Sequence, residues 1–141
     1  MTATGTAPIL VIGLGCRQDC TAAELLSLIE RSLARAGIPL NAVRALASVD
    51  LKRQEPGLLQ LAARLELELE VFSAQQLAPY APQLSHRSNL VFEKTGCFGI
   101  AESAALALAE RFAGAPATLL ITRQKSPGAT FALACFEQNP R

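Results

Sequence analysis

The chain has 141 residues, of which 50% are hydrophobic, and this length suits one domain with a core of its own. Thirteen lysines and arginines stand against twelve aspartates and glutamates, which gives a formal net charge of +1. This balance argues against binding to nucleic acid or to an anionic membrane. No apolar run approaches the roughly 20 residues of a membrane-spanning helix, and the N-terminal sequence lacks the pattern of a secretory signal, so we expect a cytoplasmic protein.

The first part of the chain predicts a strand, a helix and a second strand. The apolar run at 8–14, PILVIGL, has the length of a strand that is covered on both faces. A capping box, Thr21-x-x-Glu24, then opens a helix whose leucines recur on one face until Gly37. Residues 42–49 predict the second strand.

The middle of the chain predicts two further helices, a third strand and a long loop. Pro56 opens a helix that we expect to end near Leu67, and a strand should start near Leu69. Two prolines and several polar residues make 78–89 a long loop, which is often functional or mobile. The Ala-rich segment 99–114 predicts a helix that is buried on most sides, because its polar stripe is narrow.

The end of the chain predicts a hairpin. Residues 117–123 and 130–136 form its strands, and the turn-rich sequence QKSPGA joins them. The whole pattern predicts an α/β fold: a single-domain three-layer sandwich with a mixed sheet, in which the first strands are parallel and the C-terminal hairpin is antiparallel. We expect one domain over 1–141, with flexible tails at 1–7 and 137–141.

Four cysteines raise the question of a disulfide framework or a metal site. Cys16, Cys20, Cys97 and Cys135 are not spaced like the ligands of a zinc ribbon, and a reducing compartment disfavours disulfides. His86 is the single histidine, so the chain lacks the ligands of most catalytic zinc sites. We therefore expect reduced thiols and no bound metal.

Ligands of open α/β sheets bind at the carboxyl ends of the strands, and the first such loop is GLGCRQDC. Gly13 and Gly15 would let the backbone approach a ligand closely, and Arg17 adds a positive charge for an anion. A dinucleotide fingerprint is incomplete, because its third glycine position is Gln18. A tight turn without a ligand explains the two glycines equally well.

Two more loops have a comparable composition. The segment SVDLKRQEPGL places Asp50, Lys52 and Glu55 between a strand and a helix, where either carboxylate can cap the helix but a lysine needs an anionic partner. Gly96 and Gly99 precede another helix start, which offers free backbone N–H groups, although such glycines can also serve the path of the loop alone. Three such loops at one sheet edge predict a shared pocket for an anionic, partly apolar ligand.

The ordered segments GLGCRQDC, SVDLKRQEPGL, FSAQQLAPY, TGCFGIAESAAL and RQKSPGATFALA resemble the family of CobE and the C-terminal domain of CbiG, from cobalamin (vitamin B12) biosynthesis. The resemblance runs from about Pro8 to Phe136. It implies that the ligand is a corrin (precorrin-type) intermediate. CbiG-like members open a lactone ring on a cobalt-containing corrin precursor and release a two-carbon aldehyde. Where many relatives have a basic residue and a glycine after the arginine, this chain has Gln18 and Asp19.

A corrin precursor is a flat apolar macrocycle edged with carboxylates, so its site needs room for close approach and cations or N–H groups at the rim. The residues that match the family motifs, and to which the resemblance assigns ligand binding, are Gly13, Gly15, Cys16, Arg17, Ser48, Asp50, Lys52, Glu55, Gly96, Gly99 and Lys125. For Lys125 an ordinary exposed turn lysine is the alternative.

Two functions follow from these residues, and we favour the first. In one, the protein binds a corrin intermediate and protects it or delivers it to another cobalamin-pathway enzyme, with no cofactor. In the other, it is a lactone hydrolase that releases acetaldehyde, with Asp50 or Glu55 activating water, or with Cys16 as nucleophile and His86 as base. A generic nucleotide-binding domain is a third, weaker alternative. The sequence leaves open which corrin is bound, whether it contains cobalt, and the oligomeric state.

Overall fold

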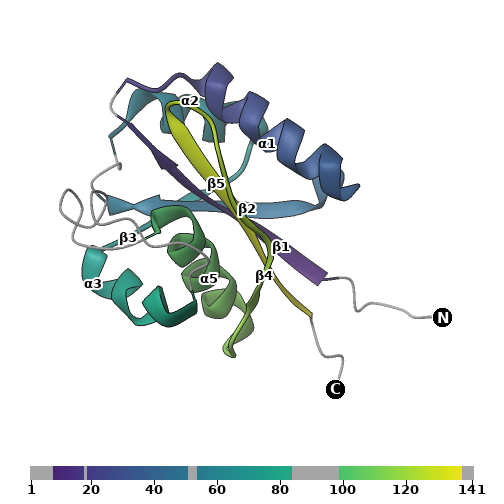
Figure 1. Ribbon diagram of the computed structural model, residues 1–141, viewed down its shortest axis with the longest axis vertical. Coiled ribbons are helices and arrows are strands. Elements are labelled where there is room, and N and C mark those ends of the chain that lie inside the picture. The colour runs from purple at the N-terminus through teal and green to yellow at the C-terminus, as the bar shows by residue number, and fades with distance from the viewer. Residues whose placement is uncertain (1–7, 18, 51–53, 84–98, 138–141) are drawn as a thin grey trace.

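A computed structural model of the chain describes residues 8–17, 19–50, 54–83 and 99–137. It shows one α/β domain in which a mixed sheet separates two layers of helices (Figure 1). The strands are β1 (Pro8–Cys16), β2 (Val43–Val49), β3 (Leu69–Phe72), β4 (Thr118–Lys125) and β5 (Ala129–Glu137). The helices are α1 (Ala22–Ala36), η1 (Leu40–Ala42), α2 (Pro56–Leu65), α3 (Ala74–Leu77), η3 (Ala78–Gln83) and α5 (Ile100–Ala113). The predicted three-layer sandwich is confirmed.

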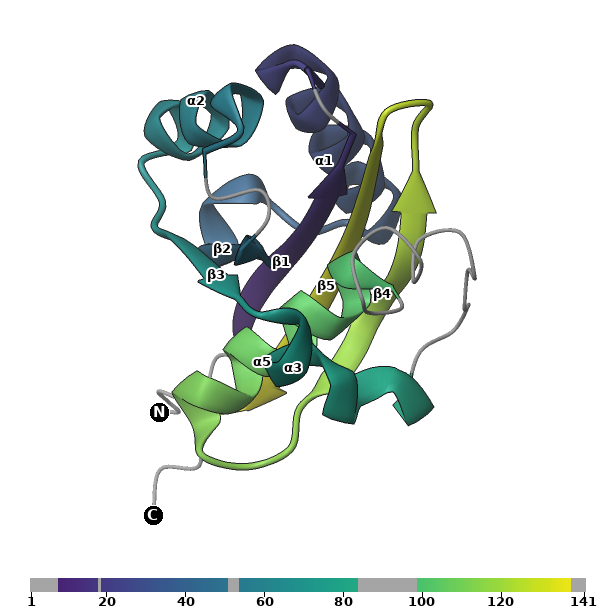
Figure 2. The same cartoon turned by 90° about the vertical axis from the view of Figure 1, so that its left-hand side faces the viewer.

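The sheet has the strand order β3-β2-β1-β5-β4. The first three strands are parallel, and β5 lies antiparallel between β1 and β4, as expected for the final hairpin. Because β4 is antiparallel to β5, it runs in the same direction as β1. The ends of β1 and β4 and the turn that leads into β5 therefore meet at one edge of the sheet, at the top of Figure 2.

Each face of the sheet has its own hydrophobic cluster. On one face, Ile12 and Leu14 of β1 pack in a cluster with Leu25 and Ile29 of α1 and Leu58 of α2. The spacing that made α1 and α2 recognisable as helices is the spacing of these buried leucines. On the other face α5 covers β1, β2 and β5 (Figure 2). None of the helices in the described ranges combines the length and hydrophobicity that a membrane crossing requires.

Helix α5 lies unusually close to β1. A Cβ atom built on Gly13 would overlap the carbonyl oxygen of Ala101 and crowd the backbone nitrogen of Ala105. This corrects our placement of Gly13 and Gly15 in a loop: β1 continues to Cys16, and both glycines are strand residues. At Gly13, the group that approaches the strand closely is the backbone of helix α5.

The first ten residues of α5 are all buried or nearly so, which explains its weak amphipathic pattern. Even Glu102 is 1% exposed, and its carboxylate accepts a hydrogen bond of 2.7 Å from the backbone N–H of Arg123 in β4. The narrow polar stripe expected from the sequence is thus half buried and links α5 to the edge strand.

Three expected boundaries differ from those of the structure. Residues 78–83, predicted as loop, form η3, because a capping box starts the helical segment at Ser73: its Oγ accepts from Gln76 N (3.0 Å) and its N–H donates to Gln76 Oε1 (2.8 Å). Helix α2 ends at Leu65, since Glu66 has a left-handed φ of 57°. Glu137, expected in a tail, ends β5. The rest of the expected loop, 84–89, and of the expected tails, 1–7 and 138–141, lies outside the described residues.

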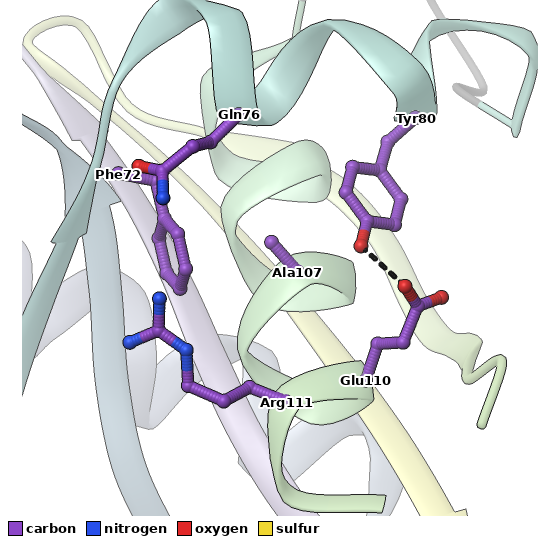
Figure 3. A pocket seen from close by; sticks show the side chains of 6 residues that line it. All are labelled: Phe72, Gln76, Tyr80, Ala107, Glu110 and Arg111. Carbon is purple, nitrogen blue, oxygen red and sulfur yellow. Dashed lines mark hydrogen bonds between the residues drawn. The ribbon is translucent and has the colours of Figure 1, made fainter. Parts of the chain in front are cut away.

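A hollow of about 360 Å³ lies between α3, η3 and α5, lined by Phe72, Gln76, Tyr80, Ala107, Glu110 and Arg111 (Figure 3). The Tyr80 hydroxyl donates to Glu110 Oε1 at 2.8 Å. The Arg111 guanidinium lies 4.6 Å above the Phe72 ring and pairs with Glu70 at 3.1 Å. Because its charged groups already have partners in the protein, we interpret the hollow as the packing seam between η3 and α5.

The contact at Gly13 predicts a large cost for any side chain there. Gly13→Ala should lower the free energy of unfolding by about 3 kcal/mol or more, because the added methyl group meets helix backbone that cannot rotate away. Urea unfolding measures this change. Gly15→Ala is the matched control on the same strand: its Cβ would be close only to the Thr130 hydroxyl, at 2.6 Å, and a rotation of that side chain relieves the contact. Equal losses for both variants would contradict the prediction.

Tyr80 offers a direct test of the seam, since it is the one tyrosine in a chain without tryptophan. Burial, then the hydrogen bond to Glu110 and its negative charge, raises the pKa of Tyr80 to about 12. The folded protein thus retains a proton that the unfolded chain, with a pKa near 10, releases. Stability should therefore fall as the pH rises from about 10 to about 12.

Absorbance titration of the phenol should give a midpoint near 12 in the folded protein. Glu110→Gln should move this midpoint partway toward the ordinary value, because burial, the largest cause, remains. Glu70→Gln, a matched change on the neighbouring ion pair, should leave it in place. A native midpoint near 10 would show that the seam is open to water.

Candidate functional site

Most of the expected site segments meet where β1 and β2 end. We call this region the carboxyl edge and define it by the described residues 16–17, 19–21, 48–50, 54–55, 99–100 and 125–128. Cys16 pairs with Ala129 across the β1–β5 ladder, so the β4–β5 turn lies beside the end of β1. Ile100, at the start of α5, lies 3.7 Å from the position of a Cβ on Gly15. The described parts of these segments therefore lie at one edge of the sheet, and the pocket that they were expected to share stays a prediction.

The loop after β1 is held from both sides. The Arg17 N–H donates to the Gly128 carbonyl at 2.9 Å, and the Asp19 N–H donates to Glu55 Oε2 at 2.9 Å. Glu55 is the N-cap residue of α2, but its side chain makes no capping hydrogen bond and reaches across to the first loop instead. Of the two uses proposed for Glu55, helix capping is therefore excluded, and its carboxylate joins the first two candidate loops.

The family resemblance implies a glycine at the position of Asp19, and the backbone of Asp19 shows why glycine would suit this position. Its φ is 67°, in the left-handed region that glycine enters freely and that aspartate tolerates better than most residues. The loop therefore keeps the required turn despite the substitution. Gln18 lies outside the described residues.

The carboxylate of Glu24 is bound to the β4–β5 turn. Its Oε2 accepts from Ser126 Oγ at 2.5 Å and from the Gly128 N–H at 2.7 Å. Half of the predicted capping box is present, since Thr21 Oγ1 accepts from the Glu24 N–H at 3.0 Å, but the Glu24 side chain does not return to Thr21. The hydrogen bonds from Ser126 and Gly128, and more weakly the nearby Arg17 charge, lower the pKa of Glu24. Sequence spacing missed this contact because the partners are up to 104 residues apart.

The other predicted site residues occupy different environments. Ser48 is fully buried, and its Oγ donates to the Leu14 carbonyl at 2.7 Å, so it ties β2 to β1. Asp50 follows β2 and is half-buried. Gly99 has a left-handed φ of 47° and is the N-cap residue of α5. Lys52 and Gly96 lie outside the described residues, so their expected ligand contacts stay predictions.

The described cysteines, Cys16, Cys20 and Cys135, form no disulfide bond with one another. Cys16 is half-buried at the end of β1, and Cys20 is buried with its Sγ 3.8 Å from both the Thr21 carbonyl and Glu24 Oε1. His86, the base required if Cys16 were a nucleophile, and Cys97 lie outside the described residues. Within the described ranges, no group of three or more His, Cys, Asp or Glu side chains is arranged to hold a metal ion.

Two cations lie on either side of the β4–β5 turn. Lys125 ends β4 directly before Ser126, and Arg17 is hydrogen-bonded through its backbone to Gly128; both residues are exposed. Neither forms an ion pair within 4.0 Å with another residue of the described ranges, whereas the carboxylates of Glu24 and Glu55 are engaged. The exposed side chains of Arg17 and Lys125 therefore offer two positive charges that can pair with carboxylates of a ligand.

Comparison with known proteins finds similar sequences over most of the chain. The family described as "Cobalamin synthesis G C-terminus" matches residues 10–134. Protein CobE of a Sinorhizobium species is 39% identical over 125 residues, covering 89% of this chain and 79% of that protein. The cobalt-precorrin-5A hydrolase of Priestia megaterium is 35% identical over 126 residues, but the match spans only 32% of its length.

A solved structure supports the same assignment. The crystal structure of CobE, described as a protein from the cobalamin (vitamin B12) biosynthetic pathway, superposes with a TM-score of 0.88 at 42% identity and covers 94% of both chains. The fold, the order of the motifs and the sequence match over most of the chain agree, and the chain belongs to the cobalamin synthesis G C-terminus family.

Proposed function

We propose that this protein binds a corrin intermediate of cobalamin biosynthesis at the carboxyl edge and protects it or delivers it to another enzyme of the pathway. The observation that carries the proposal is the pair of exposed cations, Arg17 and Lys125, on either side of one turn. A corrin precursor carries several peripheral carboxylates, so two separated cations can grip two of them at once. Such charge-assisted contacts are stronger than neutral hydrogen bonds.

The backbone of the edge adds to this binding surface. The first turn of α5 starts at Gly99 beside the end of β1, and the N–H groups of a first helical turn have no partner within the helix. These donors and the positive end of the helix dipole favour an anionic group of the ligand. In this mechanism no bond is broken: the edge neutralises the charged rim of the macrocycle and holds it in place.

Glu24 and Glu55 are already engaged by hydrogen-bond donors of the protein, which favours binding over hydrolysis at these two carboxylates. A general base must be able to take a proton from water, yet Glu55 Oε2 already accepts from the Asp19 N–H, and Glu24 is engaged by the hairpin turn. The chain spans 79% of the CobE relative and 32% of the Priestia megaterium hydrolase.

A lactone hydrolase is the second candidate, because a relative with that name is 35% identical in the shared region. Here Asp50, half-buried at the end of β2, would accept a proton from water while the water oxygen attacks the lactone carbonyl. The acyl C–O bond then breaks, which leaves a carboxylate and an alcohol. The hydroxyl group next loses its proton, the C–C bond between its carbon and the macrocycle breaks, the macrocycle takes the electron pair, and the two-carbon unit departs as the aldehyde. Lys52 or the N–H groups at the start of α5 would stabilise the oxyanion.

Removal of a rim cation should weaken binding without unfolding the protein. Arg17→Ala and Lys52→Ala should each raise the Kd for cobyrinic acid, a corrin with free carboxylates, by roughly tenfold to a hundredfold, the loss expected for one charge-assisted contact. Titration followed by the visible absorption of the macrocycle measures this change. Arg35→Ala is the control, because Arg35 is an exposed arginine in the last turn of α1. If both rim variants bind like the unmodified protein, the rim proposal is wrong.

Product analysis separates the two functions. A lactone-bearing corrin precursor is incubated with the protein, and the products are analysed by mass spectrometry. If the protein only binds its ligand, the precursor should be recovered unchanged. Loss of the lactone together with aldehyde release would establish hydrolysis instead. In that case Asp50→Asn should abolish turnover and spare binding. Glu55→Gln, the matched carboxylate-to-amide change, should retain turnover if Glu55 only accepts from Asp19, since an amide oxygen can do the same.

A further inference from the structure

We infer that Glu24 is a positioning residue for the ligand: it holds the β4–β5 turn so that Lys125 and Arg17 face the same ligand from fixed places. This assignment rests on the proposed corrin-binding function and adds a residue that contacts no ligand itself. Glu24 stands on the first turn of α1, whereas Lys125 belongs to the hairpin at the other end of the chain.

The contacts of Glu24 fix the turn at two points. Ser126 Oγ and the Gly128 N–H both donate to Glu24 Oε2, at 2.5 and 2.7 Å. The turn is closed by the Ser126 N–H, which donates to the Ala129 carbonyl at 2.9 Å. The carboxylate thus holds the first residue of the turn, Ser126, and its third residue, Gly128, and restricts the movement of the turn.

The same turn connects the two cations. Lys125 is covalently joined to Ser126, and the Arg17 N–H is hydrogen-bonded to the Gly128 carbonyl. Glu24 therefore restrains the backbone next to Lys125. It also restrains Gly128, whose carbonyl accepts the hydrogen bond from the Arg17 N–H. Space at the contact is limited, because a Cβ atom on Gly128 would lie 3.0 Å from Glu24 Oε1. Loss of Glu24 should leave both cations charged and present but no longer held at a fixed separation.

Preorganised charges bind better than mobile ones, since the ligand does not have to order them. Glu24→Ala should therefore weaken cobyrinic acid binding by roughly tenfold, comparable to the loss of one cation contact. The decisive measurement is a double-mutant cycle. In an Arg17→Ala/Lys125→Ala background, Glu24→Ala should have no further effect on the Kd, because the groups that it positions are gone.

Two further variants complete the test. Ser126→Ala removes one of the two hydrogen bonds, should weaken binding by a smaller factor, and goes through the same cycle if Glu24→Ala does not fold. Glu110→Ala is the matched control: Glu110 also accepts a hydrogen bond from a hydroxyl group, but it lies eleven residues, roughly 16 Å, along α5 from Gly99. Its loss should leave cobyrinic acid affinity unchanged, and thermal unfolding of each variant confirms that the fold is intact.

The outcomes separate this inference from the function on which it rests. If the unmodified protein does not bind cobyrinic acid, the proposed function fails, and the role of Glu24 fails with it. If the protein binds and the cations matter, but Glu24→Ala and Ser126→Ala weaken binding equally with and without Arg17 and Lys125, then Glu24 acts on the fold in general and the inference alone is wrong. Unchanged affinity in folded Glu24→Ala would also overturn it.

Discussion

The close contact between α5 and β1 determines where the other parts of this protein lie. Gly13 has no side chain, so the backbone of α5 near Ala101 rests directly on the strand. The buried side chains of a helix this close to a strand must be small, which accounts for the alanines along α5. It also fixes the start of α5 beside Gly15 and thereby places the helix N-terminus at the carboxyl edge. The absence of a Cβ atom at Gly13 thus determines how α5 packs on the sheet and where the candidate site lies.

The carboxyl edge is assembled by contacts between segments that are distant in sequence. Glu55 joins the start of α2 to the first loop, and Glu24 joins the start of α1 to the final turn. In both cases a carboxylate at a helix start accepts N–H or O–H groups from a neighbouring loop. These carboxylates accept hydrogen bonds from N–H and O–H groups of the protein. The cations Arg17 and Lys125, in contrast, form no ion pair with another of the described residues. The exposed cations suit the binding of an anionic ligand, as proposed above.

Local patterns predicted most of the elements, because burial and periodicity act over a few residues. The leucines of α1 and α2 and the apolar runs of β1 and β2 are the residues that fill the two clusters. Prediction failed where a short polar signal competed with prolines: the Ser73–Gln76 capping box starts α3 and leads into η3, although Pro79 and Pro82 suggested a loop. At Glu24 the local motif was present, but a distant partner provided a stronger hydrogen bond for the side chain.

By itself, the sequence determined the three-layer α/β class, the mixed sheet with its final hairpin, and the loops from which a site would be built, since all of these follow from residue spacing. The family resemblance rested on the same motifs. Only the tertiary structure decided what each residue contacts. It assigned Gly13 to a helix contact, Ser48 to a buried hydrogen bond between strands, Glu55 to the first loop and Glu24 to the hairpin turn. The physical reason is that a side chain binds the best partner within a few ångströms, and chain folding brings that partner from anywhere in the sequence.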